Sequence, residues 1–196
     1  MSTLRLAPLS LTLVTAGLAA GLAACGSMSG TGSMPMAAPF SQEVLPDAVK
    51  VPTGHRVAWE TVGVGEITYE CRAKAGAADA FEWVFVGPKA DLRSRQGRVV
   101  GSYFGPPATW AAQDGSSLTG AQLAVAPAGS GNIPLQLVKA NPAKSMDGKG
   151  DLLGVSYIQR VATRGGVAPA TACNGMAQGS RQVVQYQADY IFWKPV

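Results

Sequence analysis

Three cysteines carry the most recognisable chemistry in this sequence: Cys25, Cys71 and Cys173. A cysteine thiolate is a nucleophile, and two thiols can join as a disulfide. Cys25 follows a run of small and apolar residues, whereas the other two cysteines lie far apart in a region of alternating polar and apolar residues. These contexts predict one role for Cys25 and a different role for the remaining pair.

The segment before Cys25 has the parts of an export signal. Arg5 is its only charged side chain, and the stretch from Leu6 to Ala24 is apolar or small. A membrane-spanning helix needs about 20 apolar residues, whereas this run contains proline and glycine and ends in small residues, as a cleaved signal does. We therefore expect a signal peptide over residues 1–24.

The tetrad Leu22–Cys25 resembles the bacterial lipobox, in which the cysteine accepts a diacylglyceryl group and becomes the first mature residue. Lipidation of Cys25 would make the membrane a partner and the cell envelope the location, because each buried CH₂ of an acyl chain contributes about 0.8 kcal/mol. Gly26, not aspartate, follows the cysteine, which indicates the outer membrane, on its periplasmic or surface face, if the organism is Gram-negative. The alternative is an ordinary signal peptide cut after Ala20 or Ala24.

Cys71 and Cys173 remain as a pair once Cys25 is set aside. In an oxidising compartment two such thiols usually form a disulfide. Two buried free thiols or a metal-binding pair are the alternatives. His55 is the only histidine of the chain, so a Cys/His metal site lacks ligands.

Neither His55 nor the acidic residues belong to a recognisable catalytic motif in the sequence. No serine occupies a G-x-S-x-G elbow, so a Ser-His-Asp set finds no nucleophile in its usual context. Glu66 and Glu70 share one strand face at a separation of roughly 13 Å, which is too far for a glycosidase pair. We therefore assign no catalytic, cofactor-binding or metal-binding residue and no cofactor. Enzymatic activity stays open, and a non-enzymatic role is favoured.

Candidate ligand-binding residues are found near one loop and on one later strand: Tyr103, Trp110, Asp114 and Arg160. Aromatic rings in exported β domains often form platforms for sugars or apolar ligands, although they also fill cores. Asp114 precedes Gly115, which is first of all a turn signal. Arg160 alternates with Ile158 along its strand and is either a paired arginine or a charge that faces a ligand.

The elements that must position these residues are strands. Residues 25–42 carry no charge and are rich in Gly, Ser, Met and Pro, which predicts a flexible tether, and the folded domain is expected over 43–196. Alternating residues predict strands over 57–62, 66–72, 81–86, 98–104, 117–125, 135–140, 154–163 and 182–193. One short helical turn is expected over 88–94. Together these indicate an all-β fold with little helix: an antiparallel β-sandwich or small β-barrel with long loops.

The charge balance argues against nucleic acid as a partner. The formal net charge is +4, and one of these charges is Arg5 in the signal segment. A residual charge of about +3 without any basic run is too weak and too dispersed for such a partner.

Two stretches, "GPPATWAAQDGS" at 105–116 and "VSYIQRVATRGGVAPATAC" at 155–173, resemble the DUF3455 family, an exported family of unknown function. The likeness extends over about residues 43–196 and includes the following matching residues: Tyr69, Cys71, Trp83, Pro107, Thr109, Trp110, Asp114, Gly115, Ser116, Ile158, Gln159, Arg160, Gly165, Gly166, Cys173, Tyr186 and Tyr190. The chain departs from the family pattern at Tyr103, where histidine is common, and at the extra residue Ala108. The resemblance supports the fold and the paired cysteines and implies no activity.

These observations favour a lipid-anchored binding or structural module of the cell envelope, with a small molecule or an envelope component as a possible ligand. The alternatives are a hydrolase of envelope polymers and an envelope assembly or chaperone-like lipoprotein. A pocket that brings acids or the single histidine together would favour the hydrolase, whereas an exposed apolar groove would favour the assembly role.

Overall fold

The computed structural model of the protein describes residues 39–77 and 79–196. The expected signal peptide over 1–24, the expected lipidation site Cys25 and residues 26–38 of the expected tether lie outside the described residues. No helix of the described part is long and apolar enough to cross a membrane.

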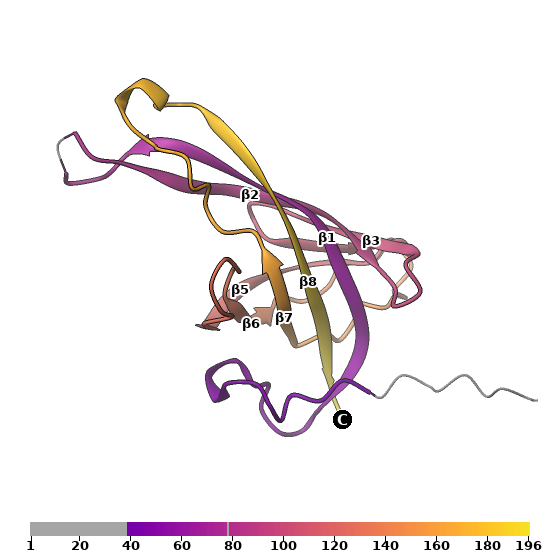
Figure 1. Ribbon diagram of the computed structural model, residues 1–196. Coiled ribbons are helices and arrows are strands. Elements are labelled where there is room, and N and C mark those ends of the chain that lie inside the picture. Colours follow the sequence, from indigo (N-terminus) through magenta and orange to yellow (C-terminus); the bar gives the residue numbers. More distant parts are fainter. Residues whose placement is uncertain (1–38, 78) are drawn as a thin grey trace, which may run out of the picture. The chain divides into compact units, whose positions relative to one another are not determined.

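Antiparallel strands dominate the described chain, which confirms the all-β expectation (Figure 1). In chain order they are β1 (His55–Ala73), β2 (Phe81–Arg93), β3 (Val99–Phe104), β4 (Thr109–Ala112), β5 (Ser117–Ala126), β6 (Leu135–Ala140), β7 (Tyr157–Gly165) and β8 (Arg181–Pro195). Helix is limited, within these residues, to the 3₁₀ turns η1 (Asp47–Val49) and η2 (Gly175–Ala177). Each strand pairs with the next, and β1 also pairs with β8, so the sheet closes into a barrel.

The barrel is irregular because register shifts interrupt five of its eight strand pairings. A bulge adds a residue to one strand of a pair and bends it, which helps a sheet to curl and close. The shift in the β5–β6 pairing falls between Gln122 and Ala124, and the shift in the β7–β8 pairing falls between Val161 and Arg164.

β1 is one strand of 19 residues, so the prediction of separate strands over 57–62 and 66–72 is wrong. Glycines between alternating runs usually mark a break. Here Gly65 is paired on both sides, and a Cβ at this position would clash with the carbonyl oxygen of Lys89. The glycine thus allows β2 to approach closely instead of ending the strand.

The helical turn expected over 88–94 is also wrong, because β2 continues to Arg93. Pro88 pairs with Ile67 of β1, and the residues from Lys89 to Arg93 pair with β1 on one side and β3 on the other. Two flanking strands thus override a local helical preference.

The barrel interior holds the main hydrophobic core. Alternate residues of β1 and β8 point inward, as their sequence patterns predict: Ile67, Tyr69, Tyr186, Ala188, Tyr190 and Phe192 are all buried. Leu92, Trp110 and Ile158 add large side chains from the other strands.

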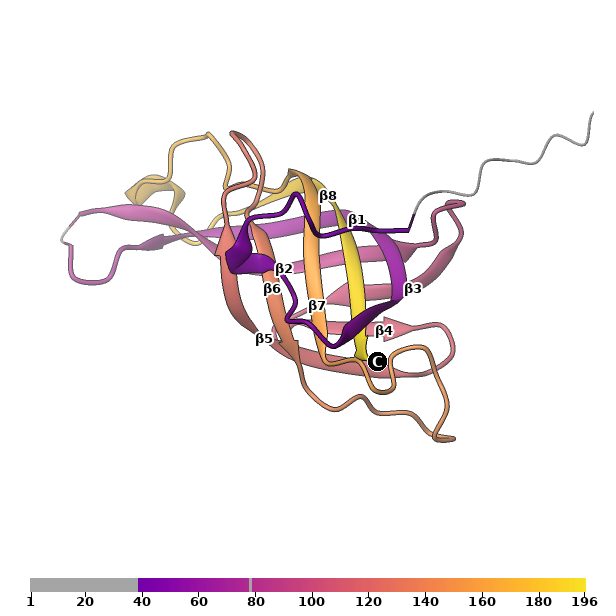
Figure 2. The same ribbon diagram turned by 90° about the horizontal axis from the view of Figure 1, so that it is seen from below.

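A second core lies on the outer face of β6, β7 and β8, where the segment before β1 crosses these strands (Figure 2). Phe40 packs edge-on against Trp193 with ring centroids 6.2 Å apart. The buried side chain of Gln159 donates to the carbonyl of Val49 at 2.6 Å and accepts from the Trp193 indole at 2.9 Å. The Gln42 side chain bonds to both the N–H and the C=O of Val51. Residues 39–42, assigned to the tether by composition, thus contact the domain.

The β1–β2 hairpin and the start of β8 extend beyond the rest of the barrel at one end (Figure 1). There Cys71 of β1 and Cys173 of the β7–β8 loop form a disulfide, with Cα atoms 5.5 Å apart. This confirms the disulfide among the alternatives that the sequence left open. The bridge ties the projecting hairpin to the loop that leads into β8.

Candidate functional site

A cavity of about 360 Å³ opens inside the barrel, and it is lined by residues from β1 to β7. Three of the four candidate ligand-binding residues line it together: Tyr103, Trp110 and Arg160. They come from β3, β4 and β7, which are brought together by barrel closure. Apolar and aromatic side chains form most of the wall, and the polar groups gather on β5, β6 and β7.

Stacked aromatic rings form the inner wall of the cavity. Tyr103 stacks on Trp110 with centroids 4.7 Å apart and an interplanar angle of 23°. Tyr190 lies against both rings, with its centroid 5.0 Å from that of Tyr103 and 6.0 Å from that of Trp110. The Trp110 side chain is buried, and its indole N–H has no hydrogen-bond partner among the described residues. These rings give the cavity a rigid apolar wall.

The rim of the cavity is also aromatic. Tyr69 and Phe85 meet edge to face with centroids 6.1 Å apart, and the Tyr69 hydroxyl donates to the carbonyl of Gly166 at 2.8 Å. Phe85 is 51% exposed although it lies on the inward-facing side of β2 next to Tyr69. A large ring at the border between cavity and solvent is well placed to contact a ligand that enters.

Four tyrosines share the environment of the cavity: Tyr69, Tyr103, Tyr186 and Tyr190. Burial raises the pKa of each phenol, and the positive charge of Arg160 opposes the rise in every case. The hydroxyls of Tyr186 and Tyr190 lie 3.2 Å apart and share a hydrogen bond. These hydroxyls are therefore neutral hydrogen-bonding groups at physiological pH.

Arg160 supplies the positive charge of the cavity. Its Nε and Nη2 atoms both donate to the carbonyl oxygen of Pro134, at 3.2 and 3.0 Å. Beside it on β6, Gln136 donates from Nε2 to Oε1 of Gln122 at 2.6 Å. The cavity thus has an aromatic side and a polar side, and the polar side bears a cation.

Asp114 lies apart from these residues, in the turn between β4 and β5. Its Oδ1 accepts from the N–H of Ser116 at 2.8 Å and from the Ser116 hydroxyl at 2.6 Å, and its Oδ2 accepts from the N–H of Asp151 at 2.6 Å. Burial would raise the pKa of Asp114, but these hydrogen bonds outweigh it and lower the pKa. The carboxylate joins the turn to the β6–β7 loop, and it does not line the cavity.

His55 stands at the start of β1 and packs edge-on against Tyr157, with ring centroids 4.9 Å apart. Its Nδ1 lies 3.1 Å from the carbonyl oxygen of Pro52. Within residues 39–77 and 79–196, no three His, Cys, Asp or Glu side chains gather in a way that could hold a metal ion.

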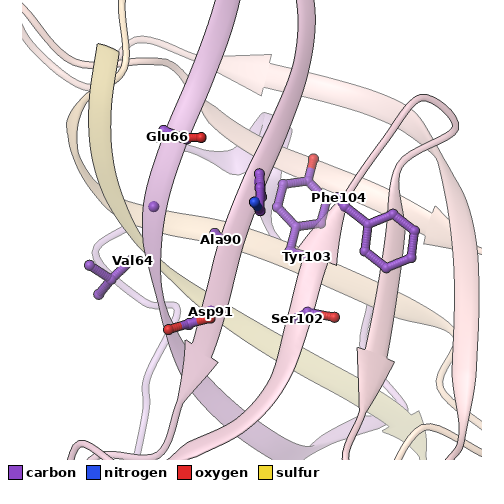
Figure 3. Close-up of a pocket in the computed structure, with 9 residues that line it drawn as sticks. Val64, Glu66, Ala90, Asp91, Ser102, Tyr103 and Phe104 are labelled. Carbon is purple, nitrogen blue, oxygen red and sulfur yellow. The ribbon is translucent and has the colours of Figure 1, made fainter. Parts of the chain in front are cut away.

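A second hollow, of about 550 Å³, lies over β1, β2 and β3 (Figure 3). Tyr103 and Phe104 leave β3 on opposite sides, so the Tyr103 ring belongs to the barrel core while Phe104 stays 45% exposed. Asp91 on its edge is paired with Arg93 at 2.9 Å. Because most of its side chains face solvent, we place the candidate site in the interior cavity.

The comparison with known families adds one finding to this geometry. A family model described as a protein of unknown function, DUF3455, matches residues 52–194. The chain belongs to the DUF3455 family. The matched region begins just before β1 and ends one residue before the end of β8, so it contains the barrel and its cavity. No curated protein and no solved structure matches the chain.

Tyr103 and Ala108, the two positions at which the sequence is expected to depart from the DUF3455 pattern, both line the interior cavity. Sequence reasoning missed the polar pair Gln122 and Gln136, because glutamine on a strand is ordinarily a solvated residue. Phe85 was not singled out either; the structure pairs it with Tyr69 of β1, on the inward face, where it lines the cavity.

Proposed function

We propose that the barrel is a binding module that takes a small aromatic or apolar ligand into its interior. The observation that carries this proposal is the cavity of about 360 Å³ behind the stacked rings of Tyr103 and Trp110. Ligand sites are concave and mostly apolar, with a few convergent polar groups, and typically occupy about 300–1,000 Å³. A cavity of about 150 Å³ can hold benzene, so this one has room for about two fused rings.

The same proposal places the module in the cell envelope, anchored through lipid on Cys25. The lipobox-like tetrad before Cys25 supports this location, and so does the Cys71–Cys173 disulfide, because such bonds persist in oxidising compartments. Intact mass of the membrane-extracted protein tests the anchor. A chain that begins at Cys25 with acyl groups is expected, and an unmodified chain with another start would overturn it.

A thermal-shift experiment on the full-length protein tests binding. The probes are 2-naphthoate and 2-naphthamide, which have the same two-ring body. A ligand at 100 times its Kd stabilises the folded state by about 2.7 kcal/mol, so at least one probe should raise Tm by several degrees.

Matched variants locate the site of that binding. Ala108→Phe adds a ring at the cavity lining, and Ala121→Phe adds the same ring at an exposed position of β5. The Tm increase should disappear in the first variant and persist in the second. If neither probe stabilises the wild-type protein, or if Ala108→Phe responds like the wild type, binding inside the barrel is excluded for ligands of this size.

A further inference from the structure

The cavity contains a cation whose hydrogen-bonding capacity the protein uses only in part. A guanidinium group has five N–H donors. Arg160 directs two of them, one from Nε and one from Nη2, at the single carbonyl oxygen of Pro134. The described residues accept no other hydrogen bond from the Arg160 guanidinium.

No carboxylate of the described residues forms an ion pair with this charge. The six ion pairs of the described residues involve Arg95, Arg181 and other surface groups, and none involves Arg160. The cavity lining contains no aspartate or glutamate. Arg160 is half-buried, and a charge that is partly withdrawn from water is ordinarily paired with an acid because its desolvation is costly.

The groups around Arg160 complement a negatively charged ligand. Gln122 accepts from Gln136 through its Oε1 atom, which leaves the N–H groups of its own amide as donors on the same side of the cavity. The pKa of each cavity tyrosine is raised by burial, so none of these phenols supplies a counter-charge near neutral pH. Apart from Arg160 and the two glutamines, the lining is apolar or aromatic.

We infer that the ligand of this cavity is an aromatic or apolar anion whose carboxylate lies against Arg160 and whose rings lie against Trp110 and Phe85. This inference rests on the proposed function and names the chemical class of its ligand. The two oxygens of a planar carboxylate can accept hydrogen bonds from two N–H groups of a guanidinium at once. These charge-assisted hydrogen bonds are stronger than those that a neutral amide accepts.

Calorimetric titration of the full-length protein with 2-naphthoate and with the neutral isostere 2-naphthamide tests the inference. A hydrogen-bonded charge pair predicts that naphthoate binds roughly 10- to 100-fold more tightly than naphthamide. Arg160→Gln should remove this preference, and Arg160→Lys should restore part of it.

Arg164→Gln is the matched control, because it removes the same charge from an exposed position of the same strand. It should leave the preference intact. Equal binding of the two probes to the wild-type protein would overturn the anionic ligand while the binding module stands, and this comparison needs no variant. Unchanged naphthoate affinity in Arg160→Gln would also overturn it. If neither probe binds, the proposed function fails together with the inference.

Discussion

Tyr103 and Trp110 are direct cross-strand partners in the β3–β4 pair, and their rings stack inside the barrel with centroids 4.7 Å apart. Cross-strand aromatic pairs stabilise sheet register. The same two rings line the cavity, so one contact serves both the core and the candidate site. The two interpretations of these aromatics, as core residues and as a ligand platform, therefore do not exclude each other.

The Cys71–Cys173 disulfide should stabilise the domain substantially. It joins residues separated by 102 positions, and removing a native disulfide typically lowers the free energy of unfolding by roughly 2–5 kcal/mol, with long loops near the upper end. Urea titration of Cys71→Ala/Cys173→Ala measures this loss. Reductant should lower the urea midpoint of the wild-type protein and have no effect on the double variant. An equal midpoint for the two proteins would show that the bridge contributes nothing.

Stability should fall in alkali because of the buried tyrosines. The pKa of Tyr190 is raised well above its ordinary value of 10.0, so above about pH 10 the unfolded chain loses this proton while the folded chain keeps it. The stabilisation is complete below pH 10 and is lost as the pH rises through the folded-state pKa. The urea midpoint should therefore decrease between about pH 10 and pH 12.

Tyr190→Phe is the control for this effect, because it keeps the ring and removes the ionisable hydroxyl. Its alkaline decrease should be smaller than that of the wild type, although Tyr186 and Tyr103 still contribute. Ultraviolet absorbance of tyrosinate follows the titration independently. A decrease of equal size in the variant would assign the effect to other groups.

Asp114 should matter for stability and not for binding. Asp114→Ala removes the acceptor of three hydrogen bonds, two from Ser116 within the β4–β5 turn and one from the amide of Asp151, and we expect a loss of about 1–2 kcal/mol because the group is largely exposed. Urea titration measures the loss, and calorimetry with 2-naphthoate should give the wild-type affinity. Because the Asp114 pKa is lowered, its contribution is present above about pH 4 and declines as the pH falls below that value.

Gly65 should not tolerate a side chain. Gly65→Ala would place Cβ against the backbone of Lys89 and Ala90 in the adjacent strand, and overpacking of this kind costs typically 1–3 kcal/mol. Gly175→Ala is a suitable control, since its Cβ would meet only the Phe81 ring at 3.5 Å, an ordinary contact. Thermal unfolding of both variants makes the comparison. A similar Tm for the two would show that β1 and β2 can separate without cost.

Much of the fold follows from local pattern. Alternation in 66–72 and 182–193 predicted which residues of β1 and β8 face the core, because side chains of a strand alternate with a period of two. The same reasoning wrongly divided β1 at its glycines. Gly65 makes room for the backbone of β2, a strand that lies elsewhere in the sequence. Two of the cavity residues, Tyr103 and Trp110, were identified as candidates from their residue type and their place near a loop.

The sequence by itself determined the strand faces, the pairing of Cys71 with Cys173 as the favoured arrangement, and the family resemblance, because these depend on local spacing and residue type. Only the tertiary structure decided that the sheet closes through β1 and β8, and that Arg160 lines a cavity together with aromatic rings and forms no ion pair among the described residues. Alternation puts Arg160 on the same face as Ile158, but the neighbours of that face come from strands far away in the chain. Whether a charge is paired depends on those neighbours, and local sequence does not contain them.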